Sequence, residues 1–251
     1  MQMILPNLFL LGFHRCGTTH LNSILCQHPD IHARGENNFF NWPIQSVSNP
    51  LTYFKMFDSP NRYRMDYSPT YVTNPQTARI LRALFPDAKY IVMLRNPKAR
   101  AYSLYKLMRA MYGDDISNFA DALKAEEVRS SSHDFAASCV LEPWLYMYTR
   151  STLYDEHLRQ YFAAIERDRF YILSLAELSK QPIATTESIL NFLDLDPSPA
   201  KSFDFSNRGF VSASVNPHPY DSESDQIMSA AFDGLTTRTD ELVGRSIDWS
   251  L

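Results

Sequence analysis

The 251-residue chain contains few cysteines, and their spacing argues against two common kinds of structural support. Cys16, Cys26 and Cys139 are an odd number of cysteines and form no Cys-x-x-Cys pair. They therefore predict neither a disulfide framework nor a zinc site. A reducing, cytoplasmic compartment is the default expectation for such a chain.

Long hydrophobic runs and an excess of positive charge are also missing. No apolar stretch approaches the roughly 20 residues needed to span a bilayer, and residues 1–6 are too few for a signal peptide before the first apolar run. The chain has 24 lysine and arginine residues against 28 aspartate and glutamate residues, a net charge of −4. This balance argues against broad nucleic-acid binding. We therefore expect neither a membrane nor a nucleic acid as a partner.

The remaining composition suits one globular domain over residues 1–251. Hydrophobic residues make up 45% of the chain and charged residues 21%, which is ordinary for a soluble protein. Apolar, partly β-branched runs at 8–11, 90–94 and 170–175 predict buried parallel strands. Strands that alternate with helices predict an α/β fold of three layers, in which helices flank a mostly parallel central sheet.

Helices and two less regular connections are expected between these strands. Residues 39–65 are rich in aromatic residues, Asn and Pro, and are expected to cover one side of the sheet as irregular structure. Residues 113–140 are polar and are expected to form a connection with one short helix. Helical patterns occupy six other segments, at about 18–27, 75–84, 101–111, 141–165, 185–192 and 224–243.

The segment from Gly12 to Thr19 carries most of the functional information. The apolar run 8–11 ends at Gly12, a tight polar loop follows, and an amphipathic stretch begins at Thr18. Such a turn between a strand and a helix aims backbone N–H groups and the helix N-terminus at an anion. Thr18 and Thr19 add hydroxyl donors, and Arg15 adds a permanently charged fork suited to phosphate or sulfate oxygens. The alternative is a tight glycine turn that binds nothing.

This loop differs from that of a nucleotide triphosphatase in two ways. The Walker A pattern has a lysine where this chain has Thr18, and the cation comes three residues earlier, at Arg15. The run 90–94 is followed by Arg95, where a triphosphatase usually places the aspartate that helps hold Mg²⁺. The loop therefore predicts a P-loop-like cradle that grips a phosphate-like group without the usual triphosphatase chemistry.

Two further segments supply candidate site residues. Arg95 and Ser103 are eight residues apart, and the intervening turn could bring both onto a second anion. Glu36 follows the first predicted helix and could act as a general base for an acceptor hydroxyl or amine. Taken singly, Arg95 could form an ordinary salt bridge, Ser103 could be a surface hydroxyl and Glu36 a solvated loop residue.

Together, these segments resemble the sulfotransferases that use 3′-phosphoadenosine 5′-phosphosulfate (PAPS). The resemblance is to the branch that contains carbohydrate N- and O-sulfotransferase domains and many bacterial stand-alone enzymes. It spans nearly the whole chain as a single sulfotransferase domain. The similar segments are Ser68-Pro69-Thr70-Tyr71, Leu94-Arg95-Asn96-Pro97, Arg100-Ala101-Tyr102-Ser103, Leu175-Ala176-Glu177-Leu178 and Asn191-Phe192-Leu193.

The resemblance implies which residues bind the donor. Arg95 and Ser103 would bind its 3′-phosphate, and Arg208, in Asn207-Arg208-Gly209, is the cationic candidate for a late nucleotide-binding loop. The residues expected to bind the 5′-phosphosulfate all belong to the first loop: Arg15, Cys16, Gly17, Thr18 and Thr19.

The resemblance also implies the reaction. Glu36, in a Glu-x-x-Phe-Phe pattern with Phe39 and Phe40, would be the catalytic base, and Arg15 would be the second catalytic residue. The implied activity moves a sulfuryl group from PAPS to a hydroxyl or amine of a small-molecule or carbohydrate acceptor by metal-free in-line displacement. Adenosine 3′,5′-bisphosphate (PAP) would be released.

This chain departs from the family pattern in three places, one of which is the late lysine- and glycine-rich nucleotide loop, which is not evident in residues 206–220. Arg15 stands where many members have lysine, and Asp66-Tyr67 precedes Ser68 where carbohydrate members often have Glu-Lys. The other functions considered are a metal-dependent P-loop kinase or triphosphatase and a non-catalytic nucleotide-binding module. The sequence leaves the acceptor and the oligomeric state open.

Overall fold

The computed structural model describes residues 4–41, 44–139, 141–207 and 220–251. Their strands form one parallel sheet in the order β2-β3-β1-β4-β5. The chain leaves β1 toward β2 and later crosses to β4, so the loop after β1 lies at the switch point where open α/β sheets bind ligands. The strands are β1 (Leu8–Leu11), β2 (Ile31–Arg34), β3 (Tyr63–Tyr67), β4 (Lys89–Leu94) and β5 (Phe170–Ser174).

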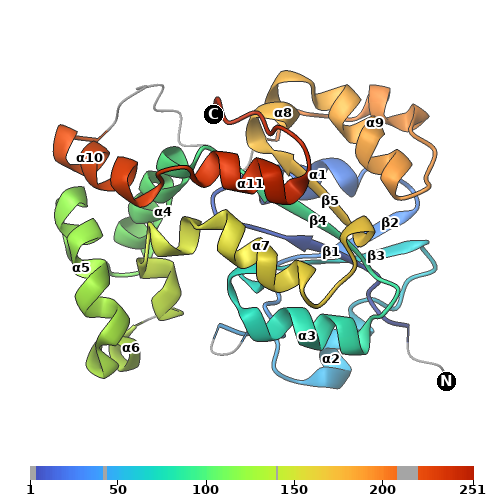
Figure 1. Ribbon diagram of the computed structural model, residues 1–251. Helices are drawn as coiled ribbons and strands as arrows, with labels where there is room; N and C mark the ends of the chain where they lie inside the picture. The colour runs from blue at the N-terminus through green and yellow to red at the C-terminus, as the bar shows by residue number, and fades with distance from the viewer. Residues whose placement is uncertain (1–3, 42–43, 140, 208–219) are drawn as a thin grey trace.

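Helices cover both faces of this sheet. Figure 1 shows α1 (Thr18–Leu25), α8 (Leu175–Lys180) and α9 (Pro182–Phe192) on one face, with α3 (Pro75–Leu84) and α7 (Tyr154–Phe162) on the other. Every residue of β1 is buried, and the strands and helices share one hydrophobic core. The predicted α/β fold, with a parallel sheet between helices, is confirmed.

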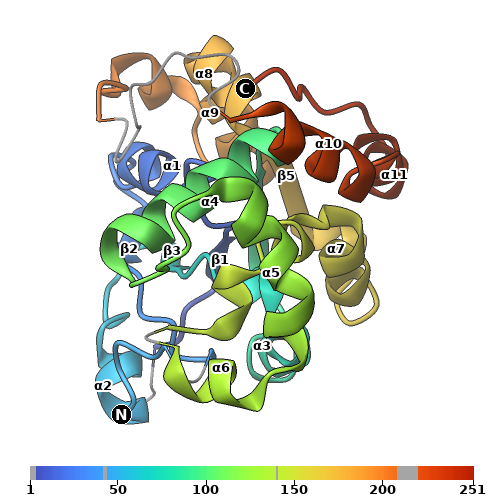
Figure 2. The same cartoon turned by 90° about the vertical axis from the view of Figure 1, so that its left-hand side faces the viewer.

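A second hydrophobic cluster lies beyond the carboxyl ends of the strands. Its buried residues come mainly from α4 (Pro97–Met111) and α5 (Phe119–Ser131), with contributions from residues 145–148 and from α10 (Ser222–Ala231). Figure 2 shows α4 crossing in front of the sheet and α6 (His133–Ser138) following α5. Because α4 begins where β4 ends, this cluster supports the helix that carries Ser103.

Of the five strands in the described ranges, β2 and β3 could not be predicted from the sequence, because charged residues interrupt their apolar runs. β3 includes Arg64 and the buried Asp66, so it lacks the continuous apolar run that revealed β1, β4 and β5. The expectation of irregular structure at 39–65 was therefore wrong for part of that segment. It also contains the short helix α2 (Pro50–Lys55), which begins where the side chain of Asn49 accepts two backbone N–H groups.

Three helix expectations also needed correction. The polar segment 113–140 forms two helices, α5 and α6, instead of one short one. The expected helix over 141–165 begins as two short 3₁₀ segments, and only α7 is α-helical. The expected helix over 224–243 is divided at Gly234, whose φ of 62° is incompatible with a continuous helix, into α10 and α11 (Leu235–Val243).

Gly12 allows the loop after β1 to pass close to Pro69. A Cβ atom on residue 12 would lie 2.3 Å from the Pro69 Cβ and 2.5 Å from its carbonyl oxygen. We expect Gly12→Ala to lower the free energy of unfolding by about 1–3 kcal/mol, because backbone would have to move. In matched denaturant titrations, Gly35→Ala should cost less than about 0.5 kcal/mol, since nothing lies within 4 Å of the added atom. Equal losses would contradict the steric explanation.

Candidate active site

The loop after β1 delivers the chain to the start of α1. The Phe13 N–H donates to the Met93 carbonyl of β4, with 3.1 Å between the atoms. Gly17 has a φ of 87° and immediately precedes α1. Because glycine has no side chain, Gly17 cannot cap the first N–H groups of α1 with a side-chain hydrogen bond. This is the arrangement with which helix N-termini bind anions.

Arg15 connects this loop to the end of β4 and to α4. Its Nε donates to the Ser103 Oγ over 3.0 Å, and its carbonyl oxygen accepts a hydrogen bond of 3.2 Å from the Arg95 Nη1. Burial, and then the neighbouring charge of Arg95, lower the pKa of Arg15, although an arginine stays protonated. The fold thus brings together three of the residues that the sequence selected: Arg15, Arg95 and Ser103.

Three buried nitrogen atoms beside the loop have no hydrogen-bond partner among the described residues: the Arg95 Nε, the Arg100 Nη2 and the His14 Nε2. Arg100 is fully buried and donates to the His14 carbonyl and to the hydroxyls of Ser151 and Thr152, which are all neutral acceptors. Burial and the charges of Arg100 and Arg15 lower the pKa of His14 to about 3. A buried cation without a carboxylate partner favours an anion nearby.

Glu36 reaches the same loop through Tyr67, the last residue of β3. The Tyr67 hydroxyl lies 2.6 Å from the Glu36 Oε1 and 2.7 Å from the Thr19 Oγ1. It lies 3.5 Å from the Thr18 Oγ1. In the sequence, Tyr67 stands out only as a difference from carbohydrate members of the family. Its place at the carboxyl end of a strand is the signal that could have identified it, but β3 itself was not recognised.

Lys106 is a second side chain that the sequence did not indicate. It lies on α4 three residues after Ser103, a spacing that places both on one side of a helix. Its Nζ lies 4.9 Å from the centre of the Tyr102 ring. Burial, and then the charges of Arg95 and Arg15, lower the pKa of Lys106. Lys106 therefore adds to the positive charge beside Arg95 and Arg15.

Residues 5–208 match the family model of the sulfotransferase domain, which is most of the chain. The chain belongs to the sulfotransferase family. Among solved structures, the sulfotransferase from Alicyclobacillus acidocaldarius is 25% identical, with a TM-score of 0.81 and coverage of 96% of each chain. The sulfotransferase domain from the curacin biosynthetic pathway shares the fold, with a TM-score of 0.54 and 16% identity over 91% of this chain and 98% of that chain.

Curated relatives of this sulfotransferase include much longer proteins. The bifunctional heparan sulfate N-deacetylase/N-sulfotransferase 1 of Caenorhabditis briggsae is 27% identical over 78% of this chain and 23% of its own length. Enzyme 2 of that name from Homo sapiens is 27% identical over 77% of this chain and 22% of its own length. The chain thus spans less than a quarter of the length of these two relatives.

Two other candidate site residues of the sulfotransferase are Cys16, which the structure describes, and Arg208, which it does not. Cys16 is fully buried, with its Sγ 3.8 Å from the Tyr154 hydroxyl, and burial raises the pKa of its thiol. Its side chain therefore packs in the core, and only its backbone can face a ligand in the loop. Arg208 lies outside the described residues. The carbonyl oxygen of Asn207, which precedes it, lies 2.7 Å from the His20 Nδ1 on α1.

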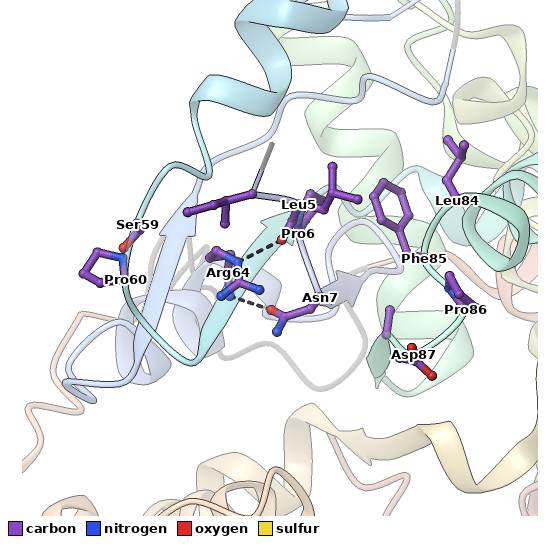
Figure 3. Close-up of a pocket in the computed structure, with 12 residues that line it drawn as sticks. Leu5, Pro6, Asn7, Ser59, Pro60, Arg64, Leu84, Phe85, Pro86 and Asp87 are labelled. Carbon is purple, nitrogen blue, oxygen red and sulfur yellow. Dashed lines mark hydrogen bonds between the residues drawn. The ribbon is translucent and has the colours of Figure 1, made fainter. Parts of the chain in front are cut away.

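A groove of about 680 Å³ lies at the other end of the strands from the candidate site residues. Figure 3 shows its lining, in which the Arg64 Nε donates to the Leu5 carbonyl and Phe85 forms part of the wall. Asn7 and Ala88, which also line it, directly precede β1 and β4, so the groove lies at the amino ends of the strands. Ligands of parallel α/β sheets bind at the carboxyl ends, and we do not assign this groove to the active site.

In the described ranges, no group of three or more His, Cys, Asp and Glu side chains is placed to hold a metal ion. Among the helices of those ranges, none has the length and apolar character needed to cross a membrane.

Proposed function

We propose that this sulfotransferase domain transfers the sulfuryl group of PAPS to a hydroxyl or amine of a small-molecule or carbohydrate acceptor. The observation that carries the proposal is the meeting of Arg15, Arg95 and Ser103 at the turn before α1. Glu36 is linked to the same turn through Tyr67. A donor with two separate anionic groups requires cationic groups that bind them, and the acceptor requires a base. These residues supply both.

The residues present fit the charged groups of PAPS. The start of α1 and the Arg15 guanidinium suit the 5′-phosphosulfate. Arg95 suits the 3′-phosphate, because its buried Nε has no partner among the described residues. Ser103 accepts a hydrogen bond from Arg15. The residues suited to the 5′-phosphosulfate and those suited to the 3′-phosphate therefore belong to one site. This division predicts a preference for PAPS over ATP, because ATP has no 3′-phosphate.

The proposed reaction needs one base and one cation from the protein. PAPS supplies an electrophilic sulfur atom and a bisphosphate leaving group. Glu36 accepts the proton of the acceptor hydroxyl or amine as the new bond to sulfur forms and the bond between sulfur and the bridging oxygen breaks. Arg15 stabilises the negative charge that develops on that oxygen. We propose a metal-free reaction, because the transferred sulfuryl group carries less negative charge than a terminal phosphoryl group.

The acceptor and the compartment are parts of the same proposal. The net charge of −4 favours a small molecule or sugar over a long polyanionic chain as acceptor. The curated relatives named as heparan sulfate N-sulfotransferases support a carbohydrate acceptor and, within it, an amine. The three free cysteines support a reducing, cytoplasmic location.

Incubation of the protein with radiolabelled PAPS and a panel of hydroxyl and amine acceptors tests the proposed function. Calorimetric titration with PAP tests the donor site independently of the acceptor. We expect PAP to bind and one or more acceptors to gain label. A protein that binds neither PAPS nor PAP would not have this function, and Mg²⁺-dependent ATP turnover would favour a kinase or triphosphatase.

Arg95→Ala is expected to weaken PAP binding about 10- to 100-fold, the range for a lost hydrogen bond to a charged group. Affinity for adenosine 5′-phosphate should change little, because that nucleotide lacks the 3′-phosphate. Calorimetry with both nucleotides gives the two affinities. Arg82→Ala is a suitable control, since Arg82 forms a surface ion pair with Glu166. Equal losses for both nucleotides would contradict the assignment of Arg95.

A further inference from the structure

Tyr67 occupies a fixed position between the candidate base and the anion-binding turn. It is 4% exposed and ends β3, a strand with β2 on one side and β1 on the other. Its backbone is in register with Leu10 of β1. A buried tyrosine on an internal strand has little freedom to move, so the position of its hydroxyl is set by the sheet.

Glu36 lies in a very different environment. Its side chain is exposed, and residues 35–38 have no regular secondary structure. The backbone of this loop is anchored to the end of β3, because the Asn38 N–H donates to the Ser68 Oγ over 3.1 Å and the Thr70 hydroxyl donates to the Asn38 Oδ1 over 2.8 Å. These bonds fix the backbone of the loop but do not involve the Glu36 side chain. In the described part of the chain, its one side-chain hydrogen bond is the bond from Tyr67.

The single proton of the Tyr67 hydroxyl fixes the direction of its hydrogen bonds with Glu36 and Thr19. Burial, and then the charge of Glu36, raise the pKa of Tyr67, so its hydroxyl keeps its proton. The Tyr67 hydroxyl donates its single proton to the Glu36 Oε1. The Thr19 hydroxyl must then donate to Tyr67. The result is a directed chain from the first turn of α1 to the carboxylate.

We infer that Tyr67 is a positioning residue, which holds Glu36 in the orientation that accepts the proton of the acceptor. This inference rests on the proposed function. Tyr67 engages Oε1 and presents Oε2 to the incoming hydroxyl or amine. Through Thr19 it also ties the base to the turn that binds the donor. A base on an exposed loop is thereby held in register with the sulfuryl group, as proton transfer and in-line attack require.

Tyr67→Phe tests this inference, because it removes the hydroxyl and keeps the ring. We expect kcat to fall about 10- to 100-fold, the range for a lost hydrogen bond to a charged group. The Kd for PAP and the melting temperature should stay close to those of the wild type. In a Glu36→Gln background, Tyr67→Phe should have little further effect, because residues that act through one another are not additive.

Tyr63→Phe provides the matched control. Tyr63 is also buried and lies at the other end of the same strand, where its hydroxyl donates to the Leu193 carbonyl over 2.9 Å. We expect this variant to lose some stability and to keep its kcat. An unchanged kcat in Tyr67→Phe, an equal loss in Tyr63→Phe, or an additive loss in the Glu36→Gln background would overturn the inference.

The same measurements separate this inference from the proposed function. A wild-type protein that binds no PAP and transfers no label would reject the proposed function, and the role of Tyr67 with it. Normal PAP binding and turnover in the wild type, with full activity in Tyr67→Phe, would reject the positioning role alone.

Discussion

Glu36→Gln is expected to lower kcat by about 10²- to 10⁴-fold, the range for loss of a general base. The amide keeps the size of the side chain but cannot take the proton of the acceptor. Glu36 is exposed, and within the described ranges its hydrogen bonds are those from the Tyr67 hydroxyl to its side chain and from the Ser46 hydroxyl to its carbonyl oxygen, so stability should hardly change. Steady-state transfer of labelled sulfate, together with PAP titration, measures both effects.

PAP affinity decides how a loss in Glu36→Gln is understood. A base acts on the acceptor, so the Kd for PAP should stay near the wild-type value while kcat falls. Glu166→Gln is the control, since Glu166 forms an exposed ion pair with Arg82 and should leave kcat unchanged. Unchanged turnover in Glu36→Gln would show that the base is a different residue or that the reaction belongs to another class.

Arg15→Ala is expected to lower kcat by about 10²- to 10³-fold, as for removal of one group that stabilises charge in the transition state. PAP binding should weaken much less, because charge on the bridging oxygen develops mainly during transfer. The structure supports this division, since Arg95 and the start of α1 remain to bind the nucleotide. Single-turnover rates and PAP titrations separate the two effects.

Arg15→Lys distinguishes charge from geometry at this position. Lysine keeps the positive charge but lacks the planar fork, so it loses the bond from the Arg15 Nε to Ser103. We expect part of the lost rate to return. Arg15→Ala with an equal loss of PAP affinity and of kcat would show that Arg15 binds the ground state only.

Continuous apolar runs revealed three strands, and charged residues hid the other two. β1, β4 and β5 could be predicted because each contains an uninterrupted apolar run of at least four residues. β3 could not be predicted, because it contains a carboxylate, Asp66, that is nevertheless buried. Hydroxyls of Tyr53, Ser68 and Tyr71 donate hydrogen bonds to it there. Burial raises the pKa of Asp66 to about 6. A sequence pattern does not show which hydroxyls will surround a carboxylate.

The candidate site divides in the same way. Arg15, Arg95 and Ser103 could be selected from the sequence, because each belongs to a local strand–turn–helix segment. Tyr67 and Lys106 could not be selected, because their importance depends on neighbours that are distant in the chain or on an unpredicted strand. The local sequence also shows that the P-loop lysine and the Walker B aspartate are absent. Their absence indicates a phosphosulfate in place of a triphosphate as the ligand.

The sequence by itself determined the local chemistry: a glycine turn at the start of a helix, an arginine in place of lysine, and an arginine in place of a metal-binding aspartate. Only the tertiary structure decided that Arg15 meets Ser103, 88 residues away, and that Tyr67 joins Glu36 to Thr19. The reason is the parallel sheet, which brings the carboxyl ends of β1, β3 and β4 to one edge. Local sequence sets what each strand end carries, and the register of the sheet sets which ends meet.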